Sequence, residues 1–185
     1  MDIDKLMDAF HRIVASVRSE NDLDCCWDAI LNITGQTGNE TLAKADIRAD
    51  LSSITLQLTS AIQLEPIPST IKLLWFGLFD ARQGEKKFAG YYFAGWANET
   101  QIQEGGPSPY FPAHRYLTST LLNTVKDESC RFSGRDDQFS VLDYAVMFGA
   151  AATLSKFAAQ NAGIQLPIYV GFDSGDFACI KRSPN

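Results

Sequence analysis

The side chains that most often act as bases and nucleophiles near neutral pH are scarce in this chain. Its 185 residues include two histidines, His11 and His114, and four cysteines. Nucleophilic catalysis needs a Ser or Cys within reach of a base, but the two histidines fall on separate expected helices, outside any recognisable catalytic motif. A metal site needs ligands at characteristic spacings, which neither the histidines nor the cysteines show. The sequence therefore predicts no catalytic residue, no metal site and no cofactor.

Two groups of acidic residues could hold a cation. Asp80, Glu85 and Lys87 have the residue types of nucleases that bind Mg²⁺ on two carboxylates beside a lysine. Here the charges fall in one short expected turn, where hydration is the ordinary explanation. The segment Asp173–Asp176 could bind Ca²⁺, but Asp and Gly are also what a tight turn requires. Both groups are better explained as turns.

The segment from Trp96 to Arg115 is the stretch most typical of a binding surface. It places aromatic, acidic and arginine side chains around Gly105 and Gly106. Aromatic and Arg residues on a loop held by a rigid sheet are what binding surfaces use. The alternative is that Tyr110 and Phe111 anchor the next helix to the core. The sequence thus predicts a partner-binding loop that consists of Glu99, Glu104, Tyr110, Phe111, His114 and Arg115.

Charge narrows the range of partners. The formal net charge is -6 and the sequence pI is about 4.8, and the basic residues are scattered. Phosphate binding needs clustered Lys and Arg, so nucleic acid is not an expected partner. Another protein is expected instead, and a basic one would suit the charge. The oligomeric state is not predicted.

The first residues and the longest apolar run predict the location of the protein. Met1 to Lys5 lack the basic start and apolar core of a signal peptide. The longest charge-free apolar run, from Tyr144 to Ser155, is shorter than the roughly 20 residues that cross a bilayer. We therefore expect a cytoplasmic protein that does not enter a membrane, with reduced cysteines.

The stretch 70–97 consists of two aromatic-rich apolar runs around a polar turn at 81–87, which predicts a long β-hairpin. Both arms are apolar on both faces, as in central strands that are covered on both sides. A second hairpin is expected over 167–182, with strands at 168–172 and 177–181. Gly175 suits the positive-φ position of its turn.

Helical periodicity covers most of the remaining chain. The N-terminal part, 1–64, predicts three helices, the third from Asn39 onward. Residues 52–60 also alternate with period two and could form a strand, but the helical spacing that begins upstream favours a helix. Two further helices are expected within 113–161, one from Ala113 and one from Ser140 to Asn161, the latter apolar nearly all round.

These elements predict a single α+β domain over 1–185, in which about five helices cover an antiparallel sheet of about four strands made by two hairpins. The lack of a catalytic constellation favours a non-enzymatic cytoplasmic protein-binding protein, such as an acidic inhibitor or a toxin-neutralising (immunity-type) factor. The alternative is a small enzyme or ligand-binding domain with an aromatic pocket between the central hairpin and the helix 140–161. That pocket would be lined by Trp75, Tyr92, Trp96 and Tyr144.

Overall fold

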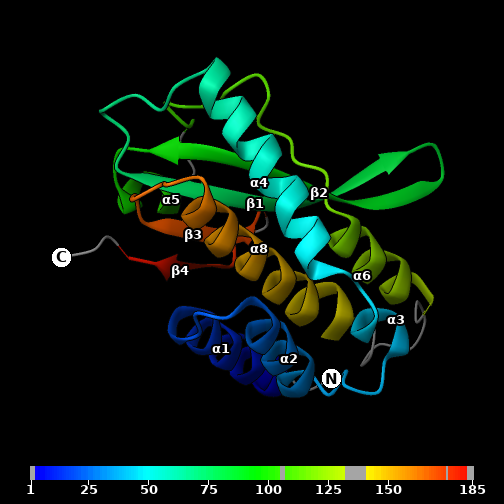
Figure 1. Cartoon of the computed structure of the whole chain (residues 1–185). Coiled ribbons are helices and arrows are strands. Elements are labelled where there is room, and N and C mark those ends of the chain that lie inside the picture. Colours follow the sequence, from blue (N-terminus) through cyan, green and yellow to red (C-terminus); the bar gives the residue numbers. More distant parts are fainter. Residues whose placement is uncertain (1–2, 105–106, 132–140, 174, 183–185) are drawn as a thin grey trace.

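A computed structural model of the chain describes residues 3–104, 107–131, 141–173 and 175–182. The helices and strands follow the expected alternation of helical segments and hairpins (Figure 1). In chain order they are α1 (Ile3–Ser19), α2 (Leu23–Ile33), α3 (Glu40–Ala43), α4 (Ile47–Leu64), β1 (Leu73–Gln83), β2 (Lys86–Trp96), α5 (Glu99–Gln103), α6 (Thr120–Arg131), the π-helix η1 (Val141–Val146), α8 (Met147–Asn161), β3 (Ile168–Phe172) and β4 (Phe177–Lys181). The expected helix start at Ser140 lies outside the described residues.

The sheet confirms the α+β prediction and refines its topology. Its order is β2-β1-β3-β4, so the two hairpins lie side by side and β1 is central. Each hairpin is antiparallel, but β1 and β3 pair in parallel, and the sheet is therefore mixed rather than fully antiparallel. The cause is that the long helical connection after β2 places β3 beside β1 and not beside β2, and β3 runs in the same direction as β1.

The first hairpin is longer than expected. The polar segment at 81–87 was predicted as a loop, but β1 continues to Gln83 and β2 begins at Lys86. The turn consists of Gly84 and Glu85, and Gly84 has a φ of 63°. A two-residue turn needs positive φ, which glycine adopts without steric cost, so the strands extend through the polar residues.

The helix α8 is the centre of the helical layer. It contacts α1, α2, α4, α6 and β3, and it lies between α4 and the pair α1 and α2 (Figure 1). Every residue from Met147 to Ala159 is buried, which confirms the expectation from its apolar surface. The stretch Val141–Asn161 is long and apolar enough to cross a membrane by length and composition alone, but 83% of its most apolar window is buried inside the fold, as in a core helix.

The helices differ from the prediction in three ways: one predicted helix is divided, one short helix is additional, and one helix begins later. Residues 52–60 are helical, as expected, but the third predicted helix divides into α3 and α4, because Asp46 caps α4 by accepting a hydrogen bond from Ala49 N at 2.9 Å. The short helix α5 was expected as loop. The helix predicted from Ala113 begins at Thr120 instead, since the preceding residues pair with β2.

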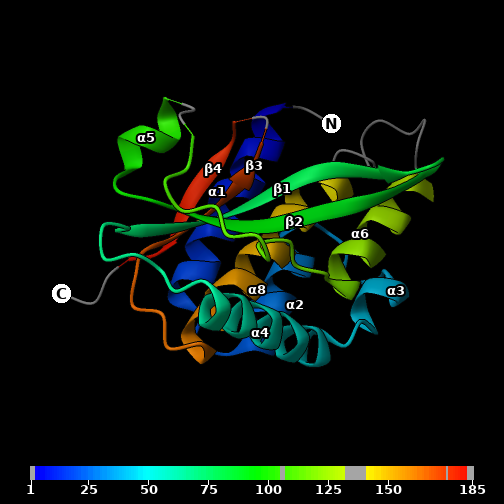
Figure 2. The same ribbon diagram turned by 90° about the horizontal axis from the view of Figure 1, so that it is seen from above.

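The two faces of the sheet are covered differently. Leu74, Phe76 and Phe93 belong to the main core with the helices. The alternate residues, among them Trp75 and Trp96, form a second apolar cluster on the outer face. On that side lies α5, opposite α4 and α8 (Figure 2). Strand β1 is central and packs against apolar side chains on both faces, as predicted. Strand β2 is also apolar on both faces, but it is an edge strand and not the central strand that the sequence predicted.

Candidate functional site

The four residues of the expected aromatic pocket do not line one cavity. Trp75 and Trp96 pack edge to face on the outer side of the sheet, with ring centroids 6.1 Å apart. Tyr144 lies on the helical side, where its ring stacks on Phe172 at 5.0 Å. The reason is the period-two alternation of β-strands, which sends the odd-numbered residues of β1 away from α8.

The structure also separates the residues of the expected partner-binding loop. Tyr110 is only 6% exposed, and its hydroxyl donates a 2.6 Å hydrogen bond to the carbonyl of Glu65. It is therefore the core anchor that the alternative interpretation described. Glu99 accepts a 2.9 Å hydrogen bond from the Tyr169 hydroxyl. Glu104 and His114 are exposed.

Phe111 and Arg115 take part in an exposed cluster that we call the aromatic surface, made up of Phe79, Tyr92, Phe111, Arg115 and Tyr116. Phe111 and Tyr116 are 50% and 56% exposed. The Arg115 guanidinium carbon lies 3.7 Å from the centroid of Phe111 and 4.6 Å from that of Tyr116. The ring centroid of Tyr92 lies 5.9 Å from those of Phe79 and Phe111. A cation in contact with two aromatic rings is favourable and restrains all three side chains.

Backbone hydrogen bonds hold this surface in place. The segment from Tyr110 to Leu117 runs along the free edge of β2: Gly95 N donates to Tyr110 O at 2.8 Å, and Leu117 N donates to Tyr91 O at 2.8 Å. Phe93 N donates to Arg115 O at 3.1 Å. These contacts cover an edge that would otherwise present unpaired backbone groups, and they present Phe111, Arg115 and Tyr116 on a supported backbone.

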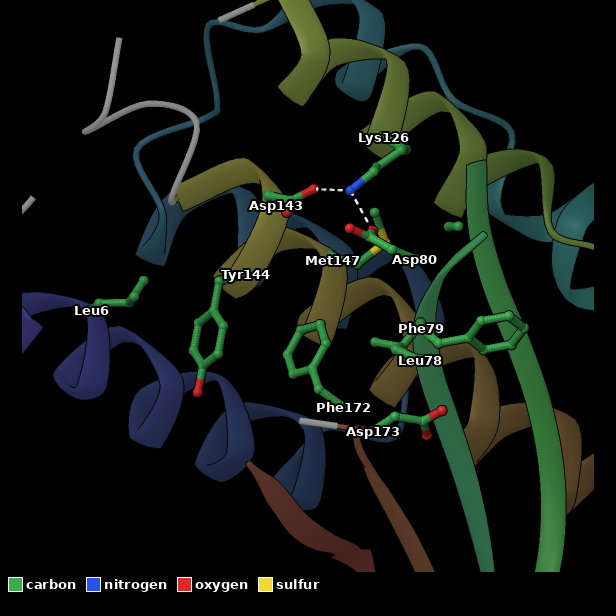
Figure 3. Close-up of a pocket in the computed structure, with 11 residues that line it drawn as sticks. Leu6, Leu78, Phe79, Asp80, Lys126, Asp143, Tyr144, Met147, Phe172 and Asp173 are labelled. Carbon is green, nitrogen blue, oxygen red and sulfur yellow. Dashed lines mark hydrogen bonds and ion pairs between the residues drawn. The ribbon is translucent and has the colours of Figure 1, made fainter. Parts of the chain in front are cut away.

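A cavity of about 490 Å³ opens on the other side of β1, where β3 ends. Strand β1 pairs with β3 only as far as Leu78 and then continues with β2 as its one partner strand, so space remains between β1, η1 and the end of β3. Its wall carries apolar and charged side chains from seven elements and the turn after β3 (Figure 3): Leu6, Leu78, Phe79, Asp80, Ala89, Lys126, Asp143, Tyr144, Met147, Phe172 and Asp173.

Lys126 is the central charge of this cavity. Its side chain is 3% exposed, and Nζ donates to Oδ1 of Asp80 and Oδ1 of Asp143, each at 2.6 Å (Figure 3). Burial alone would lower the pKa of Lys126, but the hydrogen bonds to Asp143 and Asp80 outweigh burial and raise the pKa above its ordinary value. The lysine is therefore protonated at neutral pH.

The π-helix η1 supplies two of the polar groups, Asp143 and Tyr144. Ser129 Oγ donates to Asp143 Oδ1 at 3.1 Å, and the Tyr144 hydroxyl donates to Asp176 Oδ2 at 2.8 Å. Burial and this bond to Asp176 raise the pKa of Tyr144. Segments of π-helix are rare and are frequent at functional sites.

Sequence reasoning missed most of this cavity. Asp80 was considered only with its neighbours Glu85 and Lys87, whereas its partner Lys126 lies 46 positions further along the chain. No local spacing connects these residues, and only the burial of a charged residue on the apolar face of α6 could have drawn attention to Lys126.

The four cysteines are free, and within the described ranges no three His, Cys, Asp or Glu residues are arranged to hold a metal ion. Comparison of the chain with protein-family models, with curated proteins and with solved structures found no match.

Proposed function

We propose that this protein binds another protein, which it inhibits or neutralises, and that the aromatic surface is the contact. The observation that carries the proposal is the exposure of two large rings, Phe111 and Tyr116, that both contact the Arg115 guanidinium. Aromatic and Arg side chains supply most binding energy at protein interfaces.

The surface is also prepared for binding before a partner arrives. Its rings contact one another, and the backbone of the Tyr110–Leu117 segment is hydrogen-bonded to β2. A supported surface loses little conformational freedom on association, which favours affinity.

A basic partner suits the charge of the chain. With a net charge of -6, the protein attracts a cationic partner over a distance of about 10 Å at ordinary salt. Charge of this kind acts mainly on the rate of association, whereas the aromatic contacts act on dissociation.

The test begins with a partner captured from the native host on the immobilised protein, followed by binding kinetics of purified variants. Phe111→Ala and Tyr116→Ala should each raise the dissociation rate, with a loss in affinity of roughly 30-fold, the equivalent of about 2 kcal/mol for an interface anchor. Glu104→Gln should slow association and flatten its salt dependence.

The matched control is Leu56→Ala. Leu56 is 68% exposed on α4, so this change removes a comparably accessible apolar side chain that is not part of the aromatic surface. Wild-type dissociation rates in both ring variants, or an equal loss in Leu56→Ala, would show that the aromatic surface is not the interface.

A further inference from the structure

We infer that the cavity at the end of β3 binds a small organic ammonium ion, with an apolar body and a neutral hydrogen-bond acceptor at its far end. This cavity adjoins the aromatic surface, with which it shares Phe79, but the inference does not depend on the proposed function. A volume of about 490 Å³ lies within the range of small-molecule sites, roughly 300–1,000 Å³.

The charge of the cavity lining determines which sign of charge the ligand carries. Three carboxylates line it, those of Asp80, Asp143 and Asp173, against the single ammonium group of Lys126. The lining therefore carries a net charge of -2 at neutral pH. An anionic ligand would add to this excess, and a cationic ligand reduces it.

The hydrogen bonds left unmade within the described residues show where the polar ends of a ligand belong. Asp173 uses Oδ1 to accept from Tyr92, which leaves Oδ2 for a ligand ammonium. At the opposite end, Lys126 has three N–H donors and uses two of them on Asp80 and Asp143. Its third donor can bind a neutral oxygen of the ligand.

The wall between these two ends suits an apolar body. Met147, Leu78 and Phe172 lie between Lys126 and Asp173 in Figure 3, and Tyr144 and Leu6 lie further along the wall beyond Phe172. The Tyr144 and Phe172 rings stack on one another, with centroids 5.0 Å apart and an interplanar angle of 15°, and together they form one apolar part of the wall. Contact with this wall favours a ligand whose body is an aromatic ring or an aliphatic chain.

Tyramine serves as the probe, because it combines an ammonium group, one ring and a phenol oxygen. Calorimetric titration should give a Kd of about 1 mM or tighter, a reasonable value for so few atoms. Three analogues test its parts: tyrosol lacks the ammonium, 2-phenylethylamine lacks the phenol, and 3-(4-hydroxyphenyl)propanoate carries the opposite charge. Tyrosol should bind at least about 10-fold more weakly, 2-phenylethylamine about 3-fold more weakly, and the propanoate not measurably.

Two variants locate the binding. Asp173→Asn keeps the acceptor for Tyr92 and removes the charge. It should therefore weaken tyramine binding about 5-fold or more and leave the affinity for tyrosol unchanged. Asp127→Asn is its control, since Asp127 is exposed on α6 and does not line the cavity. Leu6→Trp, at a half-buried position of α1, places a larger side chain in the cavity wall and should weaken tyramine binding about 5-fold or more. Circular dichroism should stay that of the folded protein.

Equal affinities for tyramine and tyrosol would overturn the inference, as would tyramine binding that is unchanged in Leu6→Trp or falls equally in Asp127→Asn. Absence of tyramine binding to the folded wild-type protein would overturn it as well. None of these outcomes bears on the aromatic surface, whose test uses a protein partner and different residues.

Discussion

The hydroxyl of Tyr92 donates a 2.8 Å hydrogen bond to Oδ1 of Asp173, and this contact joins the two hairpins across β1. Tyr92 belongs to β2 and the aromatic surface, whereas Asp173 follows β3 and lines the cavity. Burial and the bond to Asp173 raise the pKa of Tyr92. The two candidate sites are therefore neighbours that share one hydrogen bond.

A double-mutant cycle measures that bond. Tyr92→Phe and Asp173→Ala should each lower the free energy of unfolding by about 1 kcal/mol, the usual net value of one hydrogen bond. In a chain of this length, 1 kcal/mol corresponds to roughly 2–4 °C in melting temperature. The double variant should lose less than the sum of the single losses. Strict additivity in urea unfolding would show that the two side chains do not interact in solution.

Trp75→Ala should be severely destabilising. Trp75 is buried in the outer cluster against Trp96 and Phe177, and removal of a buried Trp costs about 3–5 kcal/mol. Phe111→Ala is the matched control, because its half-exposed ring should contribute less than about 1 kcal/mol. Similar urea midpoints for the two variants would contradict the burial of Trp75.

Substitutions of Lys126 and Asp143 should have non-additive effects on the free energy of unfolding. Lys126→Met keeps the apolar stem but leaves the partly buried Asp143 without its cation, at a cost of up to about 3 kcal/mol. Adding Asp143→Leu removes the uncompensated charge, so the double variant should be more stable than Lys126→Met alone. Chemical unfolding of the three variants provides the measurement. A double variant that is less stable than Lys126→Met would show that charge is not the dominant loss.

Stability should fall at alkaline pH, in part through Tyr110. Burial, with a smaller contribution from Glu65, raises the pKa of Tyr110 from 10.0 to about 12. Because the unfolded chain gives up the Tyr110 phenol proton at a lower pH than the folded protein, rising pH favours unfolding. The stability that this group contributes is fully present below pH 10 and is lost as the pH rises through 12. The loss has an upper limit of about 1.4 kcal/mol per pH unit for this group.

Urea unfolding between pH 9 and 12 tests this dependence. Tyr110→Phe should have a shallower fall in unfolding free energy than the wild type over that window. Tyr116→Phe, at an exposed ring, should keep the wild-type slope. Parallel curves for the wild type and Tyr110→Phe would contradict the role of the buried phenol.

Local patterns in the sequence determined the secondary structure of this protein. The period-two pattern around Trp75 and Phe76 predicted β1 and its burial on both faces, and Gly175 marked the second turn, which the structure confirms. The helical spacing before Ile54 predicted α4 correctly. These patterns succeed because they reflect contacts between neighbours a few positions apart.

Tertiary structure alone decided how these elements combine. The parallel pairing of β1 with β3 depends on a crossover whose path no local pattern encodes. Tyr110 and Phe111 are adjacent in sequence, yet one is buried beneath α4 and the other is exposed, because the backbone pairing of their segment with β2 sends their side chains in opposite directions. Lys126, Asp80 and Asp143 meet only because three separate elements pack together, since attraction between charges depends on their distance in space and not on their separation along the chain.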